Sequence, residues 1–226
     1  MNTQISAFRE NLQLGEIIRF QNMAIIPLFA PDEASSNYLT LHDAITQQAI
    51  LISEVSESGT VPNLKVENRS PFPVLMLDGE ELVGAKQNRV LNTTVLLREL
   101  TVATIPVSCT EHGRWSGQSG HPSMEYGYVH SPRTREKKAA SVSASLVTDN
   151  TFQSNQSQVW DEVSHRSREA SFHSPTGAMR DVFEHVSHSL EYYCQSFQSL
   201  PRQRGIMVFV NGKVSGLDWI SSVTAY

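Results

Sequence analysis

VLMLDGEELVGAKQNRVLNTTVLL, residues 74–97, places a dense group of polar side chains between two apolar runs. The runs, Val74–Leu77 and Val90–Leu97, are short and mostly apolar, as buried strands are. Further short strands are predicted on either side, over residues 23–29, 49–55, 64–68 and 102–107. Strands of this length at regular spacing favour a sandwich-like or barrel-like sheet over residues 15–115.

The last third of the chain has helical periodicity. Trp160 and Val163 share one face of a predicted helix over residues 159–170. Ser174 is a candidate N-cap, Pro175 suits the first helical position, and a second helix is expected over residues 176–198. Apolar side chains at helical spacing predict its buried stripe, which comprises Met179, Val182, Phe183, Val186 and Leu190.

Two shorter elements complete the expected fold. Leu41, Ala44 and Ile45 predict a short helix over residues 38–45. Near the end of the chain, Asn211-Gly212 lies between two apolar runs and predicts a β-hairpin over residues 206–217. Asn-Gly suits a type I′ turn because both central residues of that turn need positive φ.

These patterns predict an α+β fold in a single domain over residues 1–226, with a β-rich body and C-terminal helices and a terminal β-hairpin packed on it. The body is expected over residues 15–115, and the helices and hairpin over residues 159–226. Residues 116–158 are mostly polar and are interpreted as a solvated loop region, with room for one short helix over residues 134–146.

Composition excludes several classes of function. The formal net charge is −5, and the 226 residues show no basic excess of the kind that nucleic-acid binding needs. No apolar run is long enough to span a membrane, and the first residues lack the pattern of a signal peptide. Cys109 and Cys194 are too few and too far apart for a disulfide scaffold, so we expect reduced thiols in a cytoplasmic protein.

The polar group between the two central runs could form a binding site. Gly79 and Gly84 allow sharp turns, and a lysine and an arginine together suit a pyrophosphate or a carboxylate. Carboxylates could bind ribose hydroxyls or act as acid and base. The alternative is a hairpin turn with surface ion pairs, which contribute little energy. The candidate residues are Asp78, Glu80, Glu81, Lys86, Gln87, Asn88, Arg89 and Asn92.

A second polar group follows the predicted strand over residues 102–107. A nucleophilic Cys109 would need a nearby cation to lower its pKa, and Arg114 or His112 could supply one. Glu111 could act as acid or base, and Trp115 could stack on a base. The alternative interpretation makes Cys109 a small buried hydrophobe and Trp115 a core residue. Neither group has metal-ligand spacing, and no metal or cofactor is predicted.

Several of these stretches, taken in order, resemble one known family. LDGEELVGAKQNRVLNTT, IPVSCTEHGRW, VWDEV, SPTGAM and QRGIMVFVNGKVSGLD are similar to the successive motifs of the ARG and rhodanese-phosphatase-superfamily-associated protein domain, where ARG stands for ADP-ribosylglycohydrolase. The resemblance extends from about Ile17 to the end of the chain. It implies a place in ADP-ribose or NAD-linked metabolism through the enzymes that the family accompanies, and it supplies no catalytic residues.

Three hypotheses follow. If the runs 74–77 and 102–107 lie side by side, the two polar groups meet at one rim, where Lys86, Arg89, Arg114 and Trp115 could hold a nucleotide or nucleotide sugar. The chain would then bind an ADP-ribose- or NAD-derived ligand, or process it with Glu80, Glu81 or Glu111 as acid and base. The third hypothesis is a structural or protein–protein interaction module without a small ligand. The sequence does not fix an oligomeric state.

Overall fold

The computed structural model describes residues 6, 10–31, 37–56, 59, 62–115 and 124–226. The chain forms two compact units, one from residues 1–38 and 188–226 and the other from residues 39–187. The prediction of a single domain over residues 1–226 stays a prediction. Within the described ranges, no helix is both long and apolar enough to cross a membrane.

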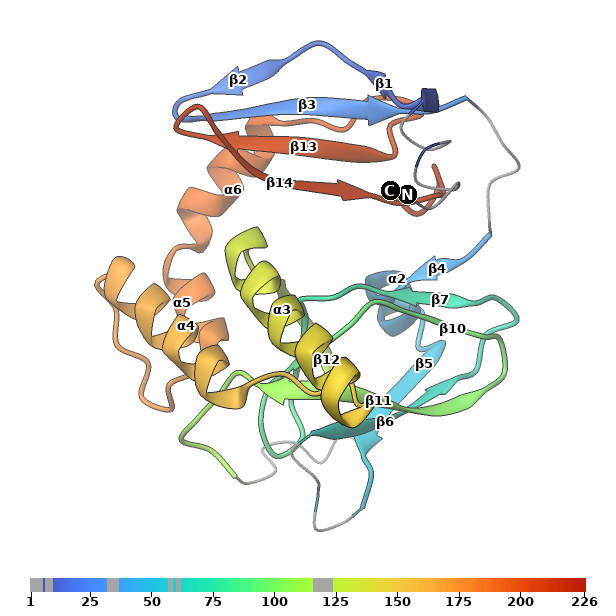
Figure 1. The fold of residues 1–226 in the computed structure, drawn as a ribbon, viewed down its shortest axis with the longest axis vertical. Helices are drawn as coiled ribbons and strands as arrows, with labels where there is room; N and C mark the ends of the chain where they lie inside the picture. The colour runs from blue at the N-terminus through green and yellow to red at the C-terminus, as the bar shows by residue number, and fades with distance from the viewer. Residues whose placement is uncertain (1–5, 7–9, 32–36, 57–58, 60–61, 116–123) are drawn as a thin grey trace. The chain divides into compact units, whose positions relative to one another are not determined.

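The first unit joins both ends of the chain in one antiparallel sheet (Figure 1). Its strand order is β1-β3-β13-β14, with β2 also paired to β3. Asn211 and Gly212, between β13 and β14, have φ of 51° and 75°, which confirms the predicted hairpin turn. The strands are β1 (Gln13–Leu14), β2 (Ile18–Phe20), β3 (Met23–Phe29), β13 (Gly205–Val210) and β14 (Lys213–Trp219).

The second unit contains two sheets. The six-stranded antiparallel sheet has the order β12-β8-β9-β11-β6-β5, and a three-stranded sheet has the order β10-β7-β4. The larger sheet comprises β5 (Ile50–Glu54), β6 (Asn63–Asn68), β8 (Glu80–Val83), β9 (Arg89–Leu91), β11 (Val102–Cys109) and β12 (Glu125–Val129). The smaller sheet comprises β4 (Leu39–Thr40), β7 (Val74–Met76) and β10 (Val95–Leu97).

One hydrophobic core holds these two sheets together. The short helix α2 (Leu41–Thr46), capped by the Thr40 side chain, contributes Leu41 and Ala44 to it. The sheets contribute fully buried side chains that include Ile52, Leu64, Val66, Val74, Met76 and Leu82. The architecture is α+β, as predicted, because helices of the second half of the unit pack on a mainly antiparallel sheet.

The region predicted over residues 116–158 as a solvated loop with one short helix is correct for the helix but wrong for its length and for the strand before it. Residues 116–123 lie outside the described residues, but the rest contains β12 and the 18-residue helix α3 (Pro132–Asp149). Ser131 caps α3 and Pro132 begins it, which is a strong helix start. The helix buries only Thr134, Lys138 and Val142. Since two of these three are polar, hydrophobic periodicity gives only a weak signal, and the helix is longer than the expected residues 134–146.

The predicted helix over residues 176–198 is also wrong in its continuity. It forms as α5 (Met179–His185) and α6 (Ser187–Ser196), separated at Val186. Ser174 does not cap the helix at its first turn; its hydroxyl accepts from the Ala178 amide, and α5 begins one residue later. Of the predicted stripe only Met179 and Val182 are buried, and Leu190 is 38% exposed. The preceding helix, α4 (Gln156–Glu169), forms close to its prediction.

The strand pairing around the polar groups differs from the expectation. Val90–Leu97 is not one strand, because β9 and β10 belong to different sheets. β7 pairs with β10 and β4, whereas β11 pairs with β6 and β9, so the runs 74–77 and 102–107 are not neighbouring strands. Glu80 and Glu81 lie within a strand, β8, that the sequence analysis treated as a turn.

Candidate functional site

The pairing of β9 with β11 brings the two predicted polar groups together. Arg89 lies opposite Cys109 in the register, and the Thr110 amide donates to the Asn88 carbonyl at 3.1 Å. The chain turns between β8 and β9 at Gly84 and Ala85, both with positive φ, of 119° and 49°. The two polar groups therefore do meet, but through the pairing of β9 with β11 and not through the runs 74–77 and 102–107. We call Gln87, Asn88, Arg89, Cys109, Glu111, Arg114 and Trp115 the strand-end cluster.

Arg114 is fully engaged inside this cluster. Its Nε donates to both carboxylate oxygens of Glu111 at 2.9 Å, and its Nη2 donates to Glu111 Oε2 at 2.7 Å and to Asn88 Oδ1 at 3.1 Å. Its Nη1 donates to the Ala85 carbonyl at 2.9 Å. Burial alone would raise the pKa of Glu111, but the hydrogen bonds from Arg114 and Thr176 and the Arg114 charge outweigh it and lower that pKa. Arg114 therefore clamps the β8–β9 turn to the end of β11.

The loop over residues 174–178 is fastened to the same place. The Gly113 amide donates to the Thr176 carbonyl at 2.7 Å, and Glu111 forms a β-bridge with Ala178. A Cβ atom at Gly113 would lie 3.1 Å from the Thr176 backbone, so a larger residue there would need that backbone to shift slightly. A cavity of about 420 Å³ opens beside this junction, and its lining includes Asn88, Glu111, Arg114, Thr176 and Arg180.

Arg89 has a very different environment from Arg114. Its side chain is completely buried, yet Nη1 makes a 3.2 Å hydrogen bond to Gln87 Oε1 and only a long 3.5 Å contact to the Asn88 carbonyl. Nε and Nη2 have no hydrogen-bond partner among the described residues. The Glu54 carboxylate lies 3.8 Å from Nη2, which is too long for a hydrogen bond. A buried guanidinium with two nitrogens that lack a hydrogen-bond partner is costly.

Trp115 lies over this buried cation. The Arg89 guanidinium carbon is 5.8 Å from the centre of the indole ring, and the Lys86 ammonium is 5.7 Å from it. Both distances are within the range of cation–π attraction. Trp115 is 48% exposed, so it is not the core residue of the alternative interpretation. The ring thus contacts a fully buried cation while remaining half exposed itself.

Cys109 is buried and is not placed like an activated nucleophile. Its thiol donates to Gln87 Oε1 at 3.0 Å. Burial raises the pKa of the thiol more than the Arg89 charge lowers it. Cys109 and Cys194 are both free thiols.

Glu80 and Glu81 are buried in β8 and hold their protons unusually well. Burial raises the pKa of each to about 7, against opposing hydrogen bonds. The Glu80 carboxylate accepts from the Leu77 amide at 2.6 Å and from the Tyr126 hydroxyl at 3.2 Å. Glu81 accepts from the Thr110 hydroxyl at 2.5 Å. Glu81 is thus next to the strand-end cluster, behind Thr110.

Two of the predicted ligand residues have structural partners instead. Asp78 pairs with the buried Nζ of Lys138 on α3, which also donates to the Leu91 carbonyl. Asn92 donates to the Phe152 carbonyl at 3.0 Å and accepts from the Ser108 hydroxyl at 2.7 Å. These contacts attach α3 and the segment after it to the sheet. Sequence reasoning missed Lys138, and its spacing from Thr134 and Val142 was the available signal.

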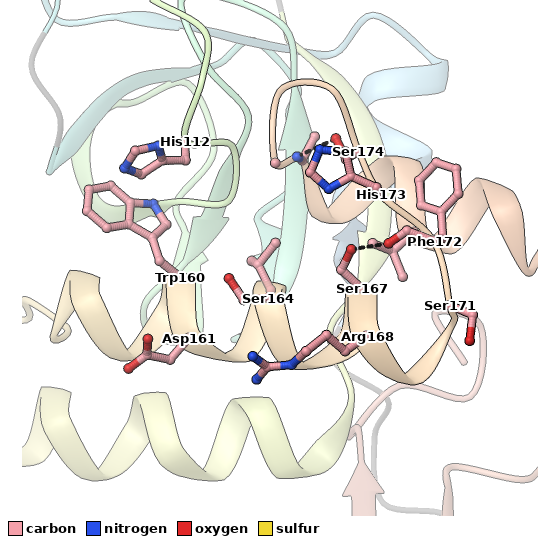
Figure 2. A pocket seen from close by; sticks show the side chains of 14 residues that line it. His112, Trp160, Asp161, Ser164, Ser167, Arg168, Ser171, Phe172, His173 and Ser174 are labelled. Carbon is pink, nitrogen blue, oxygen red and sulfur yellow. Dashed lines mark hydrogen bonds between the residues drawn. The ribbon is translucent and has the colours of Figure 1, made fainter.

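His112 alone among the predicted residues lines a cavity of about 740 Å³ next to α4 (Figure 2). Its ring meets the indole of Trp160 edge to face, with centroids 4.5 Å apart. The opposite wall is formed by the turn after α4, which carries Phe172 and His173. Sequence reasoning placed Trp160 on one face of a predicted helix and did not find this cavity.

The motifs that meet at these cavities belong to one family profile. The match to the ARG and Rhodanese-Phosphatase-superfamily-associated Protein domain covers residues 11–226. The chain belongs to this family. Its name links the ARPP-1 domain to ADP-ribosylglycohydrolases, and that link agrees with an ADP-ribose context. No curated protein and no solved structure matches the chain.

Proposed function

We propose that this ARPP-1 domain binds an ADP-ribose- or NAD-derived nucleotide and that Arg89 holds the diphosphate. The carrying observation is the pair of nitrogens, Nε and Nη2, that have no hydrogen-bond partner on the buried Arg89 guanidinium. A phosphate oxygen pair is the usual partner of such a planar fork. The family name supports the nucleotide class, and the contacts of Arg89 support the position.

Arg114 takes a different part in this proposal from the one expected from sequence. All of its nitrogens are engaged with Glu111, Asn88 and Ala85. A ligand would have to break these bonds to use Arg114, at a cost similar to what the ligand would gain. We therefore propose that Arg89 binds the phosphate and that Arg114 holds the loop that carries Trp115 in place.

Trp115 and Lys86 complete the proposed site. The half-exposed indole covers Arg89, and a small rotation of this ring would open the guanidinium to a ligand. Lys86, whose ammonium is 5.7 Å from the centre of the same ring, adds positive charge for a doubly charged diphosphate. Gln87 fixes the orientation of the guanidinium, because its amide oxygen accepts hydrogen bonds from both Arg89 and Cys109.

Turnover of the nucleotide is a second candidate function, and the protonation of Glu80 and Glu81 favours it. A carboxyl with a pKa of about 7 can give or take a proton near neutral pH. Glu81 is the better placed of the two because Thr110, its hydrogen-bond donor, also joins the Asn88 backbone.

Isothermal titration calorimetry of the whole chain with ADP-ribose, NAD and AMP tests the binding proposal. Arg89→Met should weaken ADP-ribose binding by roughly 10- to 100-fold, the scale of losing hydrogen bonds to a charged group. Arg69→Met is the matched control, because Arg69 is an exposed arginine paired with Glu67 on the same unit. Equal affinity in wild type and Arg89→Met, with the ligand bound, would refute the assignment.

Glu81→Gln separates binding from turnover. The amide keeps the shape of the protonated acid but cannot exchange a proton. If the chain hydrolyses ADP-ribose or NAD, Glu81→Gln should lose turnover and keep its affinity in the same calorimetric assay. Full turnover in this variant would remove Glu81 from the reaction.

A further inference from the structure

We infer that the cavity beside α4 is a separate binding site for a flat nitrogen heteroaromatic ring, such as a free nucleobase or the base end of a nucleotide. The inference goes beyond the proposed function, because it holds for an uncharged ligand even if no diphosphate binds at Arg89. None of the residues that argue for Arg89 is needed for it.

The size and walls of the cavity suit such a ring. Its volume of about 740 Å³ lies within the range of small-molecule sites. Figure 2 shows His112 and Trp160 on one side, with Phe172 and His173 across from them. Three apolar side chains, Val163, Ala178 and Val182, also line it, and all three are buried. A planar ring can pack edge to face or offset against aromatic walls of this kind.

An unmatched donor indicates that the ring carries an acceptor. The Nε1 atom of Trp160 is buried and has no hydrogen-bond partner among the described residues. Buried tryptophan N–H groups nearly always find an acceptor. His112 contacts the same indole with its ring rather than with a hydrogen bond, at an interplanar angle of 78°. Because Nε1 is covered in this structure, the indole must rotate before a ring nitrogen or an exocyclic carbonyl of the ligand can provide the missing acceptor.

The walls are held in place independently of any ligand. Phe172 stacks on His185 with centroids 4.5 Å apart and an interplanar angle of 19°. The Ser174 hydroxyl donates to Asp181 at 2.5 Å and accepts from the Ala178 amide at 2.8 Å. Both contacts join the turn after α4 to α5, so this wall of the cavity is preformed, which lowers the entropic cost of binding.

The test uses the whole chain labelled with ¹⁵N-tryptophan and two uncharged or nearly uncharged probes, adenosine and nicotinamide. The indole signal of Trp160 should move downfield as its N–H gains an acceptor, and the probe that binds more tightly identifies the type of base. Trp160→Phe, which keeps a ring but removes the N–H, should weaken binding about five- to tenfold, the scale of one neutral hydrogen bond. His112→Ala should weaken it about three- to tenfold.

Two controls keep this result separate from the proposed function. His188→Ala, on exposed α6, and Arg89→Met should leave the affinity for adenosine and nicotinamide unchanged. If neither probe shifts the Trp160 signal at millimolar concentration, the inference is wrong, whatever Arg89→Met does to ADP-ribose. It is also wrong if a probe binds with the same affinity in wild type, Trp160→Phe and His112→Ala.

Discussion

Arg89 and Arg114 lie in the same cluster, but substitution of the two should affect stability very differently. Arg114→Met removes every hydrogen bond from the guanidinium and leaves the Glu111 carboxylate, which is only 4% exposed, without its cation. Breaking a buried ion pair by removing one partner costs about 3–5 kcal/mol. For a chain of this size that loss corresponds to a melting temperature lower by roughly 6–20 °C.

Arg89→Met should be close to neutral. The variant loses the 3.2 Å bond to Gln87, which contributes about 1.5–3 kcal/mol because one partner is charged. It also removes two buried nitrogens without hydrogen-bond partners, Nε and Nη2, each of which costs about 1–3 kcal/mol in the native chain, and it takes away the cation 3.8 Å from the Glu54 carboxylate. The unbranched Met side chain fills most of the volume. These opposing contributions are similar in size, so the free energy of unfolding should change by less than about 2 kcal/mol.

Urea denaturation and calorimetric melting of wild type and both variants, without ligand, measure this difference. The two sites belong to the same compact unit, so the comparison is matched. If Arg89→Met destabilises the chain as much as Arg114→Met does, Arg89 serves the fold and its unmatched nitrogens give no argument for an anion. A large loss of stability in Arg114→Met, with little loss of stability in Arg89→Met, supports a structural role for Arg114 and a ligand-binding role for Arg89.

Three further predictions concern protonation and backbone space. The pKa of Glu81 is about 7 in the folded chain and 4.5 is its ordinary value, so its contribution to stability is full below pH 4.5 and is lost as the pH rises through 7. In urea denaturation, Glu81→Gln should therefore have a free energy of unfolding higher than that of wild type by up to about 3 kcal/mol at pH 8, and equal to it at pH 4. Burial lowers the pKa of His130 to about 3 from 6.5, so its contribution to stability is full above pH 6.5 and is lost as the pH falls toward 3. The free energy of unfolding of His130→Phe should therefore fall less between pH 7 and pH 4 than that of wild type, as measured by urea titration. Gly205→Ala would put a Cβ atom 2.4 Å from the Asp218 carbonyl, so it should strongly destabilise the β13–β14 hairpin. Gly212→Ala meets no atom within 4 Å and should cost only about 1–2 kcal/mol, because Gly212 has positive φ. Thermal melts that rank the two variants in the opposite order would contradict this prediction.

Much of the sheet was predictable because period-two patterns and turn residues act locally. The hairpin at Asn211-Gly212 and the strands β3, β5, β6 and β11 formed where the sequence placed them. The pairing partners were not predictable in the same way. Asn92 and the two residues after it break Val90–Leu97 into two strands of different sheets, and this break depends on contacts with Ser108 and Phe152 that are distant in sequence.

The helices show where hydrophobic periodicity fails. α3 buries a lysine because Asp78 and the Leu91 carbonyl compensate its charge, so a core-facing position looked like a surface position. In the opposite sense, Leu190 continues the apolar stripe of α5, but the helix ends at His185 and restarts at Ser187, so the stripe is not continuous in space. A helix was expected over residues 134–146, and the cap at Ser131 was the signal that could have placed the start of α3 correctly.

The residues of the candidate site were predicted, but their burial was not. The residues of the two polar groups do meet, yet Gln87, Asn88, Arg89 and Glu111 are all buried rather than exposed on a rim. Composition alone could not distinguish Arg89 from Arg114, because the difference lies in which carboxylate each one reaches. Glu111 is three residues from Arg114 and directly bonded to it, whereas Glu54 approaches Arg89 from another strand and stops at 3.8 Å.

The short loop after β11 connects the strand-end cluster with the cavity beside α4. Glu111 and Arg114 point inward and bond to each other, His112 contacts Trp160 in the cavity wall, and Trp115 covers Arg89. The close contact of Gly113 with the Thr176 backbone holds this loop against the turn before α5. A rigid loop that presents one aromatic ring to each side can position two ligand groups without conformational cost. The Arg114–Glu111 pair is thus the element on which both proposed sites depend, although neither ligand would contact it.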